Sequence, residues 1–299
     1  MSGIKRMTGY RYIDRVKTTD IITVLYMVVT ALYMLVFGKM LEELLIPMIV
    51  RIVVITLVGI LIFIESKRET SVLKFIHLFY PILLLTYFYG ETAQFNHFIF
   101  STNLDSIVYG WEDKLFGFQP SIEFSVRFHQ HWFSELLHFG YFSYYLLTIG
   151  VSVTFFILRP ALAEKVIFVI VTSFFIYYLV FIIFPVVGPQ YYFSYPLNEI
   201  VDTGVFSRAV KLVQYYGEHP TGAFPSSHVG MIVIFLYLSY GNIRWLFWII
   251  VPLFVLILMA TVYLKAHYAV DVFAGVLSAP IVYFLSKMFY GQIQGKLNR

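Results

Sequence analysis

Long apolar runs separated by short polar segments dominate this chain of 299 residues. A helix needs about 20 residues to cross the hydrocarbon core of a bilayer, and most of the runs reach that length. The runs cover residues 21–37, 46–64, 72–90, 139–158, 166–187, 228–240, 245–264 and 267–288. The pattern therefore predicts an all-α integral membrane protein with about eight transmembrane helices.

Two longer polar stretches interrupt the apolar pattern. Residues 91–138 contain acidic, basic and amide side chains and four His, which makes them too polar to cross a bilayer. Within them, residues 104–118 mix aromatic with charged side chains, as interfacial helices do. Residues 190–223 form a second polar loop.

These features predict three parts of the chain. Residues 1–71 hold a basic N-terminal tail and two transmembrane helices. Residues 72–288 form a six-helix bundle that carries the interfacial loop 91–138, and residues 289–299 form a tail.

Composition agrees with a membrane protein and excludes several chemistries. The chain is 60% hydrophobic and 13% charged, whereas soluble domains have about 25% charged residues. It contains no Cys, so disulfides, thiolate catalysis and cysteine-bound metals are excluded. We expect the bilayer as a partner, and no cofactor, metal or nucleic acid. The oligomeric state is left open.

The distribution of Lys and Arg predicts the orientation. Fourteen of the 21 lie on the side of the two termini and seven on the other side. Cytoplasmic segments carry the excess of Lys and Arg, so both termini are predicted to be cytoplasmic. The loop before His228 and the junction before His267 then face the periplasm, exterior or lumen.

Three ionisable residues at these outer helix ends are candidates for catalysis. His267 and Asp271 are four residues apart, which places them on one helix face, and His228 lies 39 residues upstream (267 − 228). A carboxylate beside an imidazole fixes its tautomer and leaves the other ring nitrogen free to attack. A second imidazole can protonate a leaving oxygen. Ionisable groups within membrane helices mark function by default.

Ser226 and Ser227 precede the helix that begins near His228. Backbone N–H groups and the helix dipole attract phosphate at such a helix start. Together with the two His and Asp271, this arrangement points to phosphoryl transfer through a phosphohistidine.

The same residues carry a family resemblance. Pro225-Ser226-Ser227-His228, and the segment 262–275 with His267 and Asp271, resemble the second and third signature motifs of the type 2 phosphatidic acid phosphatase superfamily. The resemblance covers roughly residues 80–287 and implies a six-helix membrane bundle, here preceded by two extra helices. It implies His267 as the nucleophile, Asp271 as the group that orients it, and His228 as the general acid.

This chain departs from the first signature motif of that family. The family's motif carries basic residues that bind the phosphate, whereas the corresponding residues 181–193 of this chain contain no Lys or Arg. Phosphate needs cationic or amide partners, so other groups must bind it. The candidate substrate-binding residues are Ser226, Ser227, Lys265, Gln190, Tyr191 and Arg208.

The chain resembles the inositol phosphorylceramide synthase and sphingomyelin synthase branch in these departures and in features of the interfacial loop, namely Asp105, Glu112, Leu115-Phe116-Gly117 and Pro120. That branch transfers a phospho-headgroup to a lipid alcohol. Two activities on a lipid phosphate therefore stay open: hydrolysis, and transfer to a lipid alcohol as acceptor. Phosphatidic acid, an isoprenoid diphosphate, phosphatidylinositol and its phosphate are all compatible substrates.

Three other interpretations of the His and Asp residues use different chemistry. They could form a proton relay in a membrane carrier, although no repeat of the two halves is evident. They could be ligands of a metal. The chain could also be a scaffold that has lost catalysis together with its basic residues.

Overall fold

The structure is a computed structural model, and it describes residues 14–38, 41–197, 199–200 and 204–297. These residues form helices and no strand, so the predicted all-α fold is confirmed. Most of the predicted basic N-terminal tail lies outside the described residues. In chain order the helices are α2 (Thr18–Phe37), α3 (Leu41–Lys67), α4 (Ser71–Phe95), α5 (Asp105–Phe116), α6 (Pro120–Arg127), α7 (His131–Leu158), α8 (Pro160–Ile183), α9 (Pro189–Tyr192), α10 (Val205–Gly217), α11 (Ser227–Ser239), α12 (Arg244–Tyr263) and α13 (Ala269–Leu297).

Seven of these helices are long and apolar enough to cross a membrane, namely α2, α3, α4, α7, α8, α12 and α13. The expected sixth span is α11, which has only 13 residues and so extends about 20 Å. Most of its residues are buried because it packs between α8, α12 and α13. Helix α13 continues to Leu297, where the sequence predicted a tail from residue 289.

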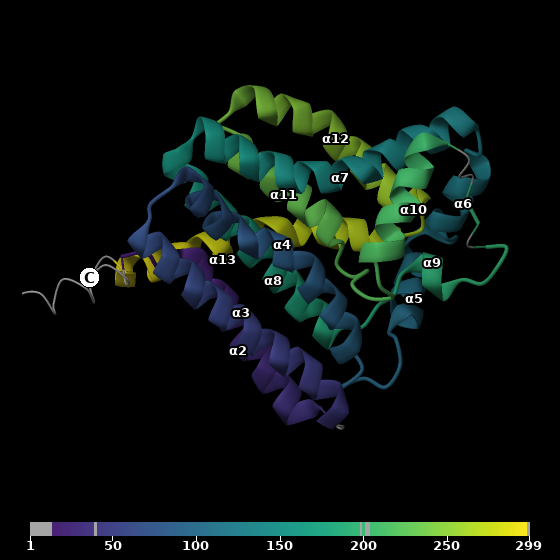
Figure 1. Ribbon diagram of the computed structural model, residues 1–299. Helices are drawn as coiled ribbons and strands as arrows, with labels where there is room; N and C mark the ends of the chain where they lie inside the picture. Colours follow the sequence, from purple (N-terminus) through teal and green to yellow (C-terminus); the bar gives the residue numbers. More distant parts are fainter. Residues whose placement is uncertain (1–13, 39–40, 198, 201–203, 298–299) are drawn as a thin grey trace, which may run out of the picture.

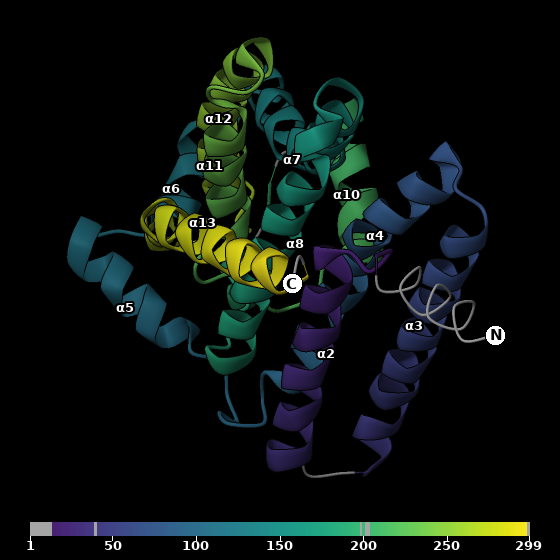
Figure 2. The same ribbon diagram turned by 90° about the vertical axis from the view of Figure 1, so that its left-hand side faces the viewer.

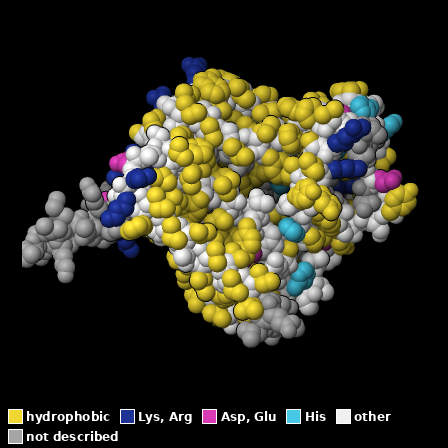
Figure 3. All heavy atoms as spheres, viewed as in Figure 1, with side chains coloured by type: hydrophobic (Ala, Val, Ile, Leu, Met, Phe, Trp, Pro, Cys, Tyr) yellow, Lys and Arg dark blue, Asp and Glu magenta, His cyan; other side chains and the backbone are white. Residues whose placement is uncertain are grey.

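The short helices gather at one end of the bundle. Helices α5, α6, α9 and α10 lie at the right of Figure 1, while α13 ends at the left. Figure 2 shows α2 and α3 on one side of the bundle and α5 on the other. Apolar side chains cover the middle of the face in Figure 3, and Lys and Arg lie towards its two ends. This distribution fits a bundle whose waist lies in the hydrocarbon region.

Buried ionic contacts join the two N-terminal helices to the rest of the bundle. Arg51 of α3 forms a two-pronged ion pair with Glu91 of α4, at 2.8 and 3.0 Å, and both side chains are buried. At the other end of α4, the buried His77 contacts Asp20 of α2 and Glu65 of α3. Unpaired charges are costly in a membrane, so these pairs fix how α2 and α3 dock.

Candidate active site

The two predicted catalytic His lie in contact. His228 is in the first turn of α11, and His267 lies in the short connection between α12 and α13. Nδ1 of His228 is 3.2 Å from Nε2 of His267, a hydrogen-bond distance. Two segments 39 residues apart in the chain thus meet at the end of the bundle that carries the short helices.

A backbone carbonyl fixes the tautomer of His267. Nδ1 of its ring lies 2.7 Å from the carbonyl oxygen of Ala223, which only accepts hydrogen bonds, so Nδ1 carries the proton. Burial lowers the pKa of His267 to about 4, against the opposing effects of the Ala223 hydrogen bond and the Glu218 carboxylate. The ring is therefore neutral near pH 7, and Nε2 has a free lone pair. The hydrogen bond between the two rings then has His228 Nδ1–H as its donor.

Asp271 lies close to His267 but makes its shortest hydrogen bond elsewhere. Oδ2 of Asp271 is 3.6 Å from Nδ1 of His267, which is longer than a hydrogen bond. The same oxygen accepts a hydrogen bond of 2.7 Å from the backbone N–H of Tyr268. The carboxyl group of Asp271 thus holds the backbone beside His267 and makes no hydrogen bond to its ring.

The start of α11 offers backbone donors to an anion. The side chain of Ser226 caps the helix by accepting from the N–H of Val229. The N–H groups of Ser227 and His228 belong to the first helical turn and have no partner within the helix. Ser227 and His228 both line the pocket that contains His267, so these amides lie beside the two imidazole rings.

The structure does not bring the predicted basic residues to the two His. Lys265 has a left-handed backbone conformation, with φ of 60°, and its buried ammonium donates to the carbonyl oxygens of Leu197 and Glu199 at 2.5 and 2.6 Å. Burial lowers the pKa of Lys265 to about 8. Arg208 is exposed on α10, and Tyr191 is 45% exposed on α9. None of these three side chains lines the pocket around His267.

The pocket around His267 is lined by a carboxylate, that of Glu218, and not by the predicted basic residues. Glu218, which follows α10, accepts hydrogen bonds from the hydroxyls of Tyr141 and Tyr145 at 2.5 and 2.8 Å. The predicted residue Gln190 also lines the pocket, and its amide donates to Glu218 at 3.3 Å. Glu218 lies within residues 190–223, which the sequence predicts as a polar loop.

The interfacial helix α5 contributes two more buried carboxylates. Asp105 accepts hydrogen bonds from the backbone N–H groups of Val187 and Gly188, at 3.0 and 2.9 Å, and from the hydroxyl of Tyr268 at 3.1 Å. Glu112 accepts from the N–H of Ala269, the first residue of α13. Burial raises the pKa of Glu112 to about 7. Helix α5 therefore holds the two residues that follow His267 and the backbone of Val187 and Gly188.

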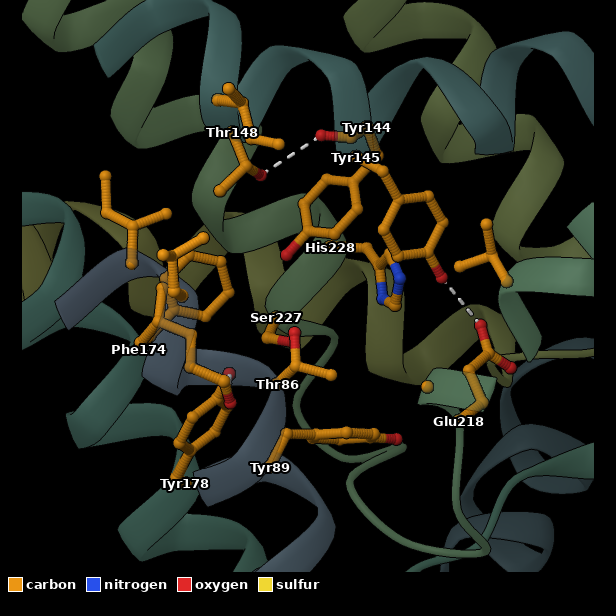
Figure 4. Close-up of a pocket in the computed structure, with 16 residues that line it drawn as sticks. Thr86, Tyr89, Tyr144, Tyr145, Thr148, Phe174, Tyr178, Glu218, Ser227 and His228 are labelled. Atoms are coloured by element: carbon orange, nitrogen blue, oxygen red, sulfur yellow. Dashed lines mark hydrogen bonds between the residues drawn. The ribbon is translucent and has the colours of Figure 1, made fainter. Parts of the chain in front are cut away.

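Two pockets reach the His pair, and a third shares Gln190 with one of them. The pocket that holds both rings has a volume of only about 20 Å³, close to what one water molecule occupies. An apolar pocket of about 280 Å³ lies between α4, α7 and α8 and reaches His228 (Figure 4). A polar pocket of about 310 Å³ lies on the other side of Gln190, lined also by His138, Glu199, Lys211 and Gln214.

The apolar pocket opens towards the lipid-facing surface. Leu83 of α4 and Ile149 of α7 line it and are 75% and 54% exposed. Figure 4 shows His228 beside Tyr144 and Tyr145, with Glu218 and Tyr89 at the same end. Tyr89, Glu218, Ser227 and His228 line both this pocket and the small one, so the two are continuous.

Comparison with known proteins agrees with this site. The family model of the PAP2 superfamily matches residues 108–285, more than half of the chain, and the chain belongs to that superfamily. The match spans α5 to α13 and so contains both His and Asp271. No curated protein and no solved structure matched the chain. Membership supports a phosphatase-type activity on a lipid phosphate in a membrane.

Proposed function

We propose that the protein is a membrane enzyme that removes a phosphoryl group from a lipid phosphate through a covalent intermediate on His267. The observation that carries the proposal is the contact between Nε2 of His267, which bears a free lone pair, and Nδ1–H of His228, at 3.2 Å. A nucleophile and a proton donor are thereby fixed at one point.

The reaction proceeds in two displacements. When the anionic phosphate is bound, His228 enters the reaction as the imidazolium, protonated at both ring nitrogens. Nε2 of His267 attacks phosphorus, the bond from phosphorus to the leaving oxygen breaks, and that oxygen takes the proton from Nδ1 of His228, which becomes a neutral ring. Water or an alcohol then gives its proton to Nδ1 of the neutral His228 and attacks phosphorus, the bond between phosphorus and Nε2 breaks, and the imidazolium is restored. The Ala223 carbonyl holds the ring of His267 and stabilises the positive charge that forms on it, while Asp271 fixes the backbone beside the ring.

The two rings must separate before a phosphoryl group can enter. A volume of about 20 Å³ does not admit a phosphate, and the contact between the rings occupies the position of the phosphorus. Ser227 and His228 then offer their backbone N–H groups to the phosphoryl oxygens. Arginine and lysine serve this purpose in many phosphate sites, but here amide donors carry most of the binding.

The lipid nature of the substrate is supported by the apolar pocket. Its lining from α4, α7 and α8 is suited to a hydrocarbon chain, and it ends at His228. A lipid lying with its chains between α4 and α7 would present its phosphate to His267. The exposed rim at Leu83 and Ile149 gives a path from the bilayer.

The proposal also includes the orientation of the protein in the membrane and the acceptor of the phosphoryl group. The excess of Lys and Arg on the side of the termini supports cytoplasmic termini and a site that faces the periplasm, exterior or lumen. Water reaches such a site readily, which favours hydrolysis. The resemblance of the interfacial loop to the inositol phosphorylceramide and sphingomyelin synthase branch supports transfer to a lipid alcohol as the second outcome.

Mass-spectrometric analysis of lipids tests the proposal directly. Purified enzyme is incubated with a mixed lipid extract, beside a His267→Ala variant. We expect a lipid phosphate to be consumed only by the wild type, with free phosphate as the product of hydrolysis or a new phospholipid as the product of transfer. Equal lipid profiles with the two proteins would refute the assignment of His267.

A further inference from the structure

Helix α10 packs on α7 with one face and leaves the opposite face exposed. The packed face carries Ser207 and Val210, which are buried, and Val210 belongs to one apolar cluster with Leu137 of α7. The side chains of the opposite face, which recur every three or four residues, are those of Val205, Arg208, Lys211, Leu212, Tyr215 and Tyr216. All of them are exposed, and the two Tyr are 82% and 75% exposed, so the described part of the chain does not cover this face.

The exposed face of α10 has a basic edge and an apolar edge. By the helical repeat, Lys211 and Arg208 lie towards one edge, and Leu212 and Tyr216 lie towards the other. The pockets on the two sides match these edges, because Lys211 lines the polar pocket and Val213, beyond Tyr216, lines the apolar pocket. A helix that is basic on one edge and apolar on the other is typical of helices that lie in the membrane interface.

Contacts with α7 place α10 at the border of the hydrocarbon region. The apolar run of α7 begins at residue 139. At the start of α10, the carboxylate of Glu135 accepts a hydrogen bond of 2.9 Å from the N–H of Phe206, and just after its end Glu218 accepts one of 2.8 Å from the hydroxyl of Tyr145. Helix α10 therefore crosses α7 where its apolar run begins, and Figure 1 shows it running across the direction of α7. This is the depth at which Tyr side chains are enriched in membrane proteins.

Helix α10 also forms part of the opening of the apolar pocket. Val213 and Gly217 line this pocket together with Leu83 and Ile149, which are exposed on the membrane helices α4 and α7. The apolar edge of α10 is thus continuous with the surface that faces the acyl chains. Tyr216 precedes Gly217 at this opening and extends the same surface.

We infer that the exposed face of α10 docks into the membrane leaflet beside the site, and that its partners are anionic phospholipid headgroups. Leu212 and Tyr216 enter the boundary between headgroups and acyl chains, and Arg208 binds a lipid phosphate at the level of the headgroups. A guanidinium matches a phosphate in both charge and geometry. The inference goes beyond the chemistry of His267, and it gives Arg208 a partner outside the pocket around that residue.

Fluorescent labels measure the depth of each edge. The chain contains no Cys, so one label can be placed at a time. Leu212→Cys, Tyr216→Cys and Lys211→Cys proteins are labelled with bimane in nanodiscs of phosphatidylcholine and phosphatidylglycerol. We expect lipids brominated in their acyl chains to quench the labels at Leu212 and Tyr216, and aqueous iodide to quench the label at Lys211. Leu146→Cys, at an exposed apolar position of α7, is the reference for a label in lipid.

Replacement of Arg208 tests the preference for anionic headgroups. In the protein labelled at Leu212→Cys, quenching by brominated phosphatidylglycerol is compared with quenching by brominated phosphatidylcholine. We expect phosphatidylglycerol to be enriched around the label, and Arg208→Gln to reduce the enrichment about fivefold, as for one basic residue at an anionic surface. Arg127→Gln is the matched control and should keep the enrichment, because Arg127 is exposed on α6 and already paired with Glu123 at 3.1 Å.

Three results would overturn the inference. Quenching of the labels at Leu212 and Tyr216 by iodide alone means that this face lies in water. Protection of both labels from both quenchers means that protein, such as a second copy of the chain, covers the face. Equal quenching by the two brominated lipids refutes the preference for anionic headgroups. None of these measurements involves turnover, so failure of the proposed phosphohistidine chemistry in the His267→Ala comparison would leave this inference standing.

Discussion

The carbonyl oxygen of Ala223 lies 2.7 Å from Nδ1 of His267. This single contact determines the chemistry available to the ring, because a carbonyl cannot donate and Nδ1 must therefore carry the proton. Nε2 is left with its lone pair and faces Nδ1 of His228 at 3.2 Å. The carboxyl group of Asp271, at 3.6 Å from Nδ1, acts on the site through the backbone N–H of Tyr268.

Replacement of His228 should separate the two displacements. In His228→Asn the leaving oxygen has no proton donor, and we expect turnover to fall by about 10²–10⁴-fold. With a substrate whose leaving group needs no proton, the first step survives and the second slows. Phosphate should then accumulate on His267 as an acid-labile adduct, detectable by mapping peptides after rapid quenching. An adduct on any other residue, or its formation in His228→Asn/His267→Asn, would contradict the mechanism.

The sequence correctly predicted those features that depend on residues close together in the chain. Long apolar runs identify membrane helices because each helix satisfies its own backbone and only its side chains meet lipid. His228, His267 and Asp271 stand out because ionisable groups are rare at apolar helix ends. Their roles stay predictions, but the proximity of the two rings followed from a shared membrane face.

The other features of the site depend on tertiary contacts, which local sequence patterns do not encode. Lys265 is two residues from His267 in sequence, yet a positive φ turns its side chain towards the carbonyl oxygens of Leu197 and Glu199. Ala223 contributes its backbone carbonyl oxygen, and the identity of its side chain does not predict this role. Glu218 became part of the site only because hydroxyl groups from α7 reach it across the bundle.

Loss of the Asp105 carboxylate should impair activity from outside the pocket. Asp105→Ala removes the acceptor for two backbone N–H groups and the Tyr268 hydroxyl, at a cost of about 2–3 kcal/mol in the free energy of unfolding. Because Tyr268 follows His267, we also expect kcat to fall about tenfold or more as the nucleophile loses its alignment.

The control for this prediction lies on the same helix. Asp113→Ala removes an exposed acid of α5 and should change neither property. Steady-state kinetics and thermal unfolding of the two variants in detergent provide the comparison. An Asp105→Ala enzyme with wild-type kcat would show that α5 does not position His267.

Changing one partner of the buried ion pair of Arg51 and Glu91 should destabilise the fold more than replacing both partners. Arg51→Leu leaves the Glu91 carboxylate buried without its partner, which destabilises by about 3–5 kcal/mol. The double variant Arg51→Leu/Glu91→Leu removes both charges and should recover much of that loss. Apparent unfolding midpoints from tryptophan fluorescence measure this. Equal midpoints for the single and double variants would mean that the pair does not hold α3 to α4.

The acidic limb of the pH–rate profile should lie well below that of an exposed histidine. Burial lowers the pKa of His267 to about 4 from the ordinary 6.5, and only the neutral ring can attack phosphorus. As the pH falls through about 4, the ring gains a proton at Nε2 and kcat/KM should decline, while between pH 5 and 7 this group causes no change. The measurement uses a phosphodiester substrate, whose own charge is constant over the range, with fluorescence to verify that the protein stays folded.

The Glu218 carboxylate raises the pKa of His267 and so opposes the effect of burial. Glu218→Gln should therefore move the acidic limb of the pH–rate profile to still lower pH. A limb near pH 6.5 in the folded enzyme would mean that His267 is solvated in the free enzyme, and the buried contact between the two rings would then not be its resting arrangement.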